Sequence, residues 1–310
     1  MSLPLKISAH EEMIGTKRGF SLARREEITG WLFITPMLIG FIVFSFGPIL
    51  ASLIISFTDW DLLQAPKFVG FVNFAKLFKD DYFIQCMSNT LYFVITMVPI
   101  ILVVAMTLAI ILNQNIRGKA FFRSVFYFPS VVSTVAISMV WLWVFSPSDN
   151  GLLNTILHKI GVMNTPDWLG NIATVKPSLV LMRTWQSAGY YMVIFLAGLQ
   201  TISPELYEVA DIDGASKWEK LIHITIPLLS PVTFFVTIML MLAAFNIFEA
   251  IYVMTEGGPG GATNTIMYYI YHNGFRLYQM GYASALAWVL FLILVVLTII
   301  QFKLRKEESQ

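Results

Sequence analysis

Apolar residues fall into six long runs along the chain, separated by shorter polar segments. The hydrocarbon core of a bilayer is about 30 Å thick, so a helix needs about 20 consecutive apolar residues to cross it. The runs predict six transmembrane helices, preceded by a charged tail at 1–29 and followed by a polar tail at 303–310. The six runs that reach this length lie near residues 30–57, 87–112, 121–145, 178–200, 228–254 and 282–302.

The first run is longer than the apolar core of a signal peptide, and no small-residue cleavage pattern follows it. We therefore expect it to remain in the protein as a span.

Composition supports a membrane protein, because 57% of the residues are hydrophobic, 13% are charged and 25 are Phe. The net charge of +1 gives no sign of a nucleic-acid partner. A single cysteine, Cys86, excludes an internal disulfide framework and a cysteine-clustered zinc site. Four histidines scattered through polar segments argue against a metal site of any other kind; they are His10, His158, His223 and His272.

Basic residues predict the orientation, because Lys and Arg close to spans stay on the cytoplasmic side. The two tails and the connections at 113–123 and 201–227 carry thirteen Lys and Arg. The opposite side carries six, and Arg183 lies inside a span. Both termini and the 201–227 connection are therefore expected in the cytoplasm.

The 201–227 connection is unusually polar and reads as two short helices. Ser203 is a good N-cap, Pro204 fits the first helical position and Glu205 complements the positive helix end. This first helix is expected to run to about Asp211, and Gly214 then permits a turn that other residues resist.

The second helix of this connection has its own start and stop signals. Ser216 followed by Glu219 fits a capping box, and Pro227 is expected to close the helix. One interpretation is an interfacial helix pair that only connects two spans. Its apolar face would consist of Trp218, Leu221, Ile222 and Ile224.

A more specific interpretation comes from a family resemblance. Glu208-Val209-Ala210, then Asp213-Gly214-Ala215, then Ile224 and Pro227 resemble the "EAA" loop in the permease subunits of binding-protein-dependent ABC importers. In that family the loop holds a coupling helix that docks in a cleft of a cytoplasmic ATPase. Val209 for alanine and Ile226 for leucine depart from the pattern but keep its apolar character.

The resemblance extends along nearly the whole chain and is to the carbohydrate-uptake branch, of the maltose and glycerol-phosphate type. Blocks such as "FITPMLIGFIVFSFGPILASLIISFTDWD" and "YVMTEGGPGGAT" carry it. It implies an all-α membrane protein with six transmembrane helices and the type I importer permease fold. The chain lacks the extra leading helices and the large external insertion of the maltose-type larger subunit.

The resemblance also implies a function and partners. The chain would translocate a sugar or oligosaccharide delivered by an external binding protein, across a bacterial or archaeal plasma membrane. Its partners would be two copies of an ATPase subunit, which bind ATP and Mg, and a second permease that is usually a different chain. An anionic sugar or a phosphorylated polyol is an alternative substrate.

Energy for transport has to come from such a partner, because the chain contains no G-x-x-x-x-G-K-[ST] phosphate loop. Gly118-Lys119 lacks the upstream glycine and the following hydroxyl, and the glycines at 257–261 have no lysine after them. We therefore expect no enzyme activity and no cofactor in this chain.

Polar residues inside spans are the candidates for the solute path, because such groups are costly there unless they face a cavity or one another. Asn246 and Glu249, three residues apart, are expected to share a helix face. Amides and a carboxylate suit sugar hydroxyls, and the faces of Trp185, Tyr190 and Phe245 suit a pyranose ring. Bonding across helices is the alternative role. The full set of path candidates is Gln186, Tyr190, Asn246, Glu249, Arg183 and Asn89.

Arg183 lies about one and a half turns into its span from the external side, so we expect its long stem to reach the headgroups. The alternative is that it faces the path and attracts an anionic sugar. Prolines in or at the ends of spans act either as hinges or as simple kinks; they are Pro36, Pro48, Pro99 and Pro129.

The external connections at 58–86 and 146–177 are longer than turns between spans need to be. They are expected either to meet the binding protein or to cap the bundle. An intramembrane enzyme would need converging acid, base or metal ligands, which the spans do not offer. A scaffold would not require the charged loop, and an ion-driven transporter would show internal repeats.

Overall fold

The computed structural model describes residues 22–148 and 151–308, most of which are helical. By its internal contacts the chain divides into two units, residues 1–54 and 55–310. Each unit is described by itself.

From Leu22 onward, the first unit is a single long apolar helix with one irregular turn. It consists of α1 (Leu22–Phe41), a π-helical turn η1 (Ile42–Phe46) and α2 (Gly47–Ser56), and α2 runs on past the boundary of the unit. Pro48 has no N–H to donate, and the wider turn before it shifts the hydrogen bonds so that Gly47 N–H reaches Ile42 O. The proline is thereby absorbed without ending the helix.

The second unit begins with a small β-hairpin, in which β1 (Thr58–Asp59) pairs antiparallel with β2 (Lys67–Phe68). Helices α3 (Val72–Leu77), α4 (Asp81–Asn113), α5 (Lys119–Val131) and α6 (Thr134–Val144) follow. The remaining elements are α7 (Leu152–Lys159), α8 (Ile172–Leu199), α9 (Pro204–Ile212), α10 (Lys217–Lys220), η2 (Leu221–Thr225), α11 (Ile226–Leu228), α12 (Ser230–Phe245), α13 (Glu249–Met254), α14 (Ile266–Tyr271), η3 (His272–Arg276) and α15 (Met280–Glu308).

Helices lie at all six expected spans, but they are not equally apolar. In the described part of the chain, four helical segments are both long and apolar enough to cross a membrane, namely 26–56, 81–113, 230–254 and 280–305. The pair α5 and α6 makes a fifth if it is counted as one span. Helix α8, at the expected fourth span, is 28 residues long. It carries Lys176, Arg183 and Gln186 and is not among the segments that meet both criteria.

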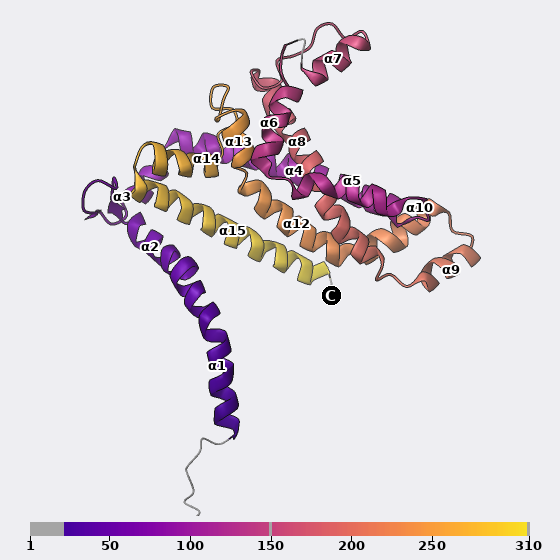
Figure 1. The fold of residues 1–310 in the computed structure, drawn as a ribbon, viewed down its shortest axis with the longest axis horizontal. Helices are drawn as coiled ribbons and strands as arrows, with labels where there is room; N and C mark the ends of the chain where they lie inside the picture. Colours follow the sequence, from indigo (N-terminus) through magenta and orange to yellow (C-terminus); the bar gives the residue numbers. More distant parts are fainter. Residues whose placement is uncertain (1–21, 149–150, 309–310) are drawn as a thin grey trace, which may run out of the picture. The chain divides into compact units, whose positions relative to one another are not determined.

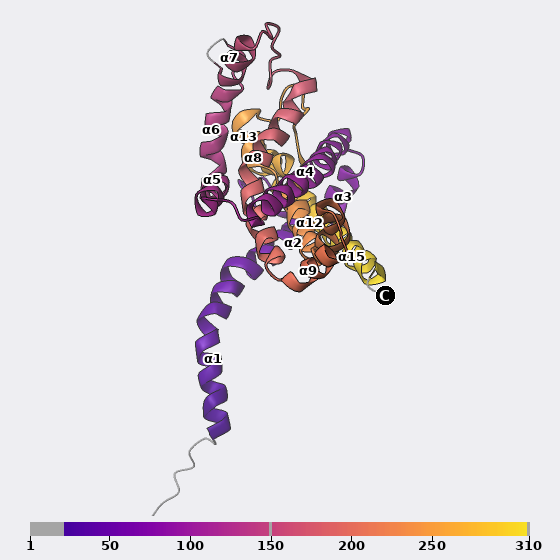
Figure 2. The ribbon, with the colours of Figure 1, turned by 90° about the vertical axis from the view of Figure 1, so that its right-hand side faces the viewer.

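The expected single helix at 121–145 is in fact two helices, bent by 99° between Val131 and Thr134. Val132 and Ser133 have extended backbone, with ψ of 140° and 133°, so the helical hydrogen bonds stop there. Pro129 lies in the last turn of α5 and contributes no N–H to it. The break is visible where α6 rises from the end of α5 (Figure 2).

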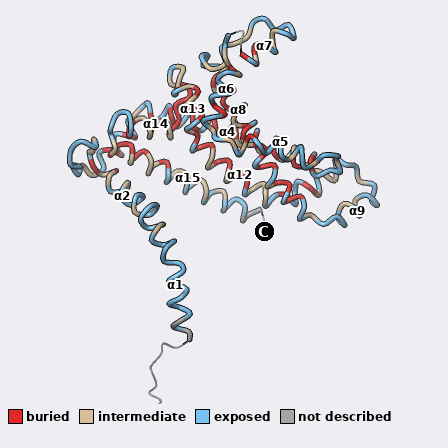
Figure 3. Tube along the Cα trace, viewed as in Figure 1, coloured by how far each residue is buried: buried red, intermediate tan, exposed pale blue. Residues whose placement is uncertain are grey.

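Helix α12 lies at the centre of the second unit, because its two faces contribute to two apolar clusters. Val236 and Leu240 pack with residues of α4 and α8, while Met241 and Phe245 pack with residues of α4, α14 and α15. Figures 1 and 3 show α4, α8 and α12 side by side, with buried residues concentrated along them. Helices α7 and α9 lie at opposite ends of this unit (Figure 2).

Candidate functional site

The polar connection between α8 and α12 folds as one compact unit. Lys220 Nζ donates to Asp211 Oδ1 at 2.6 Å, which ties the second helix to the first. The hydroxyls of Tyr207 and Thr225 lie 3.0 Å apart. Between the helices, Gly214 has a φ of +77°, a conformation that only glycine adopts without strain, and a Cβ there would meet nothing within 4 Å. Gly214 therefore serves the turn and not a close approach within this chain.

The capping signals of this connection differ between its two helices. Ser216 Oγ accepts from Glu219 N–H and the Glu219 carboxylate accepts from Ser216 N–H, which completes the predicted capping box. The backbone bond from Ser216 holds the pKa of Glu219 below its usual value. At the first helix, Pro204 lies at the first position as expected, but the Ser203 side chain makes no capping bond.

The expectation that Pro227 closes the second helix is wrong. The chain passes from α10 through the π turn η2 into α11, and Ile226 N–H reaches Leu221 O across the wider turn. Pro227 then lies in the first turn of α11, where a missing N–H has no cost. The same arrangement occurs before Pro48, so a π turn followed by proline is found twice among the described residues.

The connection presents an apolar surface that its own chain does not cover. The exposed fractions are 57% for Val209, 85% for Ile212 and 67% for Trp218. Glu208 and Asp213 are also exposed. Exposed apolar side chains ringed by charges are typical of a docking surface. Ala210, Ala215 and Ile224 of the motif are partly buried, so they support this surface from beneath.

Asn246 and Glu249 do not share one continuous helix face, contrary to expectation. Helix α12 ends at Phe245, and α13 begins only at Glu249 after Phe248 takes a non-helical conformation. Thr265 Oγ1 donates to the Ile247 carbonyl that the break leaves free, at 3.1 Å. Both Asn246 and Glu249 are exposed in this chain, so they remain available to solute or to a partner.

Arg183 turns into the protein and does not extend to the headgroups. Its Nη1 donates to Gln186 Oε1 at 2.6 Å and to Thr134 Oγ1 at 3.5 Å, and Gln186 Nε2 donates to the same hydroxyl at 3.1 Å. Thr134 is the first residue of α6. The expectation of a snorkelling Arg183 is therefore wrong, and the group instead ties α8 to the start of α6 just after the break.

The Asn89 side chain hydrogen-bonds to backbone carbonyls and does not face a cavity. Its Nδ2 donates to the carbonyls of Gly261 and Asn264, each at 2.9 Å, and its side chain is buried. This geometry favours the alternative role of bonding between segments.

The three aromatic candidates for the sugar path differ in how far they are exposed. Phe245 is fully buried, so it cannot cover a sugar, whereas Trp185 and Tyr190 are 50% and 41% exposed. Trp185 packs against Trp141, with 5.7 Å between ring centroids. Trp185 and Tyr190 thus keep the exposure that the role requires.

Sequence reasoning missed an aromatic cluster beside the α12–α13 break. The rings of Phe248, Tyr252 and Tyr271 contact one another, with centroids 5.0 to 5.5 Å apart. Arg276 Nη2 donates to the Tyr252 hydroxyl at 3.4 Å. The sequence carried one signal for this cluster: Phe248 and Tyr252 are four residues apart, a spacing that places two side chains next to each other on a helix.

On the side expected to be external, one carboxylate gathers several segments. Asp80 caps α4 by accepting from Tyr82 N–H and accepts from the hydroxyls of Tyr269 and Tyr282 at 2.7 and 2.6 Å. Partial burial would raise the pKa of Asp80, but these hydrogen bonds outweigh it and hold the pKa below its usual value. The cluster joins the long 58–86 connection to α14 and α15.

Known proteins resemble this chain over almost its whole length. It is 37% identical over 284 residues to the probable ABC transporter permease protein YesP of Bacillus subtilis (strain 168), covering 90% of this chain and 91% of that one. It is 36% identical over 295 residues to the lactose transport system permease protein LacF of Rhizobium radiobacter, covering 93% and 98%.

The fold also matches a solved structure of a bacterial alginate ABC transporter in complex with an alginate pentasaccharide-bound periplasmic protein. The TM-score is 0.82 at 22% identity, covering 93% of this chain and 97% of that one. Residues 98–307 match the family model described as "binding-protein-dependent transport system inner membrane component". These residues include the compact connection, the break in α12–α13 and most of the apolar core. The chain therefore belongs to the binding-protein-dependent transport system inner membrane components and is an ABC importer permease.

Proposed function

We propose that this chain is a membrane-spanning permease subunit that imports a sugar or oligosaccharide delivered by an external binding protein. Support comes from relatives such as the lactose permease and from the alginate transporter, whose solved complex includes a periplasmic protein with bound pentasaccharide. The membrane is a bacterial or archaeal plasma membrane, and both termini lie in the cytoplasm. A second permease and two ATPase subunits complete the importer, and the ATPases bind ATP and Mg.

The observation that carries this function is the compact connection from α9 to α11. It is held together by the Lys220–Asp211 pair and the capping box, yet it exposes Val209, Ile212 and Trp218. A surface that is rigid and apolar can transmit the motion of a nucleotide-driven partner to the spans. Residues Glu208, Val209, Ala210, Asp213, Gly214, Ala215, Ile224 and Pro227 build this coupling surface.

The solute moves past the region where α12 breaks. Asn246 and Glu249 are exposed there, and the exposed Tyr190 is a further candidate for the path. Gln186 and Arg183 act behind this region by fixing α8 against α6. Asn89 holds the loop at 255–265 and contributes to the path only through that loop.

A charge substitution in α9 tests the coupling role. Glu208→Gln removes one exposed carboxylate from the docking surface, and we expect ATP-driven uptake to fall while the chain stays in the membrane. Glu205→Gln, one turn away on the same helix and also exposed, is the matched control and should retain uptake. If both variants, with the ATPase bound, took up the solute as fast as wild type, the connection would only link two spans.

A further inference from the structure

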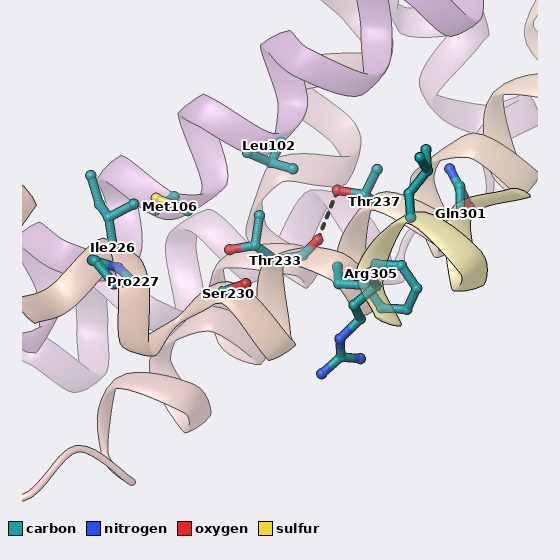
Figure 4. A pocket seen from close by; sticks show the side chains of 11 residues that line it. Leu102, Met106, Ile226, Pro227, Ser230, Thr233, Thr237, Gln301 and Arg305 are labelled. Atoms are coloured by element: carbon teal, nitrogen blue, oxygen red, sulfur yellow. Dashed lines mark hydrogen bonds between the residues drawn. The ribbon is translucent and has the colours of Figure 1, made fainter. Parts of the chain in front are cut away.

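A groove runs between α4, α12 and α15 near the C-terminal end of α15, with a volume of about 630 Å³. Figure 4 shows Leu102 and Met106 of α4 on one side and Gln301 and Arg305 of α15 on the other. Ile226 and Pro227 lie at one end of it, and Pro227 also belongs to the coupling surface.

The groove exists because α15 packs along only part of its length. Among its described side chains, the buried residues lie in the first half of the helix, and the last of them is Leu290. Helix α12 carries small side chains on the facing side, including Ser230 and Thr233, which leave the space open. Leu102 and Leu304 remain in the walls without closing it.

The walls of the groove are suited to an aliphatic chain. Thr237 donates its hydroxyl to the Thr233 carbonyl at 2.7 Å, so this hydroxyl is not a free donor for an occupant. One polar atom stands apart, because Gln301 Oε1 is buried without a hydrogen-bond partner while Nε2 contacts Met241 Sδ at 3.3 Å. Because this oxygen is buried, it does not face an occupant, and the groove suits a mostly apolar ligand.

A cation lies at the mouth of the groove. The Arg305 guanidinium lies 4.6 Å from the centroid of the Phe234 ring, and both residues line the groove. Among the described side chains no carboxylate pairs with Arg305. Arg305 also ends an apolar segment long enough to span the membrane, which places its charge at the depth of lipid headgroups.

We infer that this groove binds an anionic phospholipid, with an acyl chain against Leu102, Met106 and Thr237 and the phosphate against Arg305. An apolar groove on membrane-spanning helices is surrounded by lipid, and the cation at headgroup depth complements an anionic headgroup. Free phosphate would leave the apolar walls unfilled, so the lipid is the occupant.

The test measures lipid retained by the intact importer. The complex is reconstituted into nanodiscs of equal phosphatidylglycerol and phosphatidylcholine, returned to detergent, and analysed by native mass spectrometry for bound phospholipid. Wild type should retain phosphatidylglycerol in preference. Arg305→Glu should lower its retention about fivefold or more, the factor that corresponds to about 1 kcal/mol for one basic residue at the membrane surface.

Two further variants make the result specific. Lys303→Glu reverses an exposed charge two residues away on another face of α15 and should leave retention within about twofold, because its charge acts through water. Thr233→Trp fills the groove and should remove both lipids, even if Arg305→Glu fails to assemble. Equal losses in the two charge variants, or retention by Thr233→Trp, would overturn the site. A cross-link from Thr233→Cys to the second permease would also overturn it, by showing a protein helix in the groove.

Discussion

At the scale of single residues, one carboxylate does more than its place in the sequence indicates. Asp80 caps α4, and it also accepts from the hydroxyls of Tyr269 and Tyr282, which lie 189 and 202 residues away. Burial and the bond to Asp80 raise the pKa of Tyr269 to about 12, so this hydroxyl remains a donor at physiological pH. The cluster therefore holds together segments that are expected to be external.

Asp80→Asn should destabilise the protein, because an amide replaces a charged acceptor of two tyrosine hydroxyls. Hydrogen bonds to charged groups contribute about 1.5–3 kcal/mol each, and partial exposure of Asp80 places the loss at the low end of that range. The measurement is the midpoint of thermal unfolding of the purified complex. Asp81→Asn, the exposed neighbour in the first turn of α4, should change the midpoint little.

The pH dependence of this contribution has a definite sign. Because the folded-state pKa of Asp80 is lowered, its contribution is fully present above the unfolded value near 4 and is lost as the pH falls through the folded value. The gap in stability between wild type and Asp80→Asn should therefore close below about pH 4. A gap that widened on acidification would contradict the assignment.

Local signals at this scale were readable from sequence, and distant ones were not. The Ser216–Glu219 box and the Gly214 turn depend on neighbours within a few residues, and both are confirmed. Arg183 bonds to Thr134, 49 residues away, and the Asn89 bond to Gly261 spans 172 residues. No pattern in a single sequence identifies such distant partners. The sequence therefore could not show that Arg183 turns inward and does not reach the headgroups.

At the scale of elements, helices α5 and α8 approach each other more closely than side chains allow. A Cβ on Gly189 would lie 1.8 Å from Phe126 O and 2.9 Å from Tyr127 Cα. Small residues that let helix backbones meet are typical of packing in membranes. The contact holds α5 against α8 just before the α5–α6 break.

Gly189→Ala should therefore push α5 away from α8, because backbone atoms cannot give way as a flexible side chain does. We expect a loss of about 1–3 kcal/mol, the usual range for overpacking. Gly30→Ala in α1, where a Cβ meets nothing within 4 Å, is the matched control and should be neutral or slightly stabilising. Unchanged thermal unfolding in Gly189→Ala would show that the two helices are not packed this closely.

The positions of the helices followed from hydrophobic length, but their breaks did not. The bend at Val132–Ser133 and the interruption at Asn246–Phe248 occur inside apolar runs that read as continuous. Both breaks are stabilised by side chains from other helices, Gln186 at the first and Thr265 at the second. Tertiary partners therefore decide where these spans are interrupted.

At the scale of the whole molecule, orientation is a prediction from charge. A reporter fused after Gln310 and a label at Lys217 should both be cytoplasmic in sealed cells, while a label at Lys159 in α7 should be accessible from outside. The reason is the excess of Lys and Arg on one side, thirteen against six. Labelling of Lys217 from outside would reverse the arrangement and remove the coupling surface from the ATPase.

The α9–α11 connection is proposed to couple a partner's ATP hydrolysis to solute movement. Its most direct test is ATP-driven uptake into proteoliposomes by the complex carrying Gly214→Trp, with Gly118→Trp as the control. Both glycines have positive φ, +77° and +80°, and nothing lies closer than 3.9 Å to either added Cβ, so the backbone strain is matched. We predict that Gly214→Trp lowers uptake by roughly tenfold or more, equivalent to about 1.4 kcal/mol, while Gly118→Trp retains it. Normal uptake by Gly214→Trp, with the ATPase bound in the usual amount, would contradict the account.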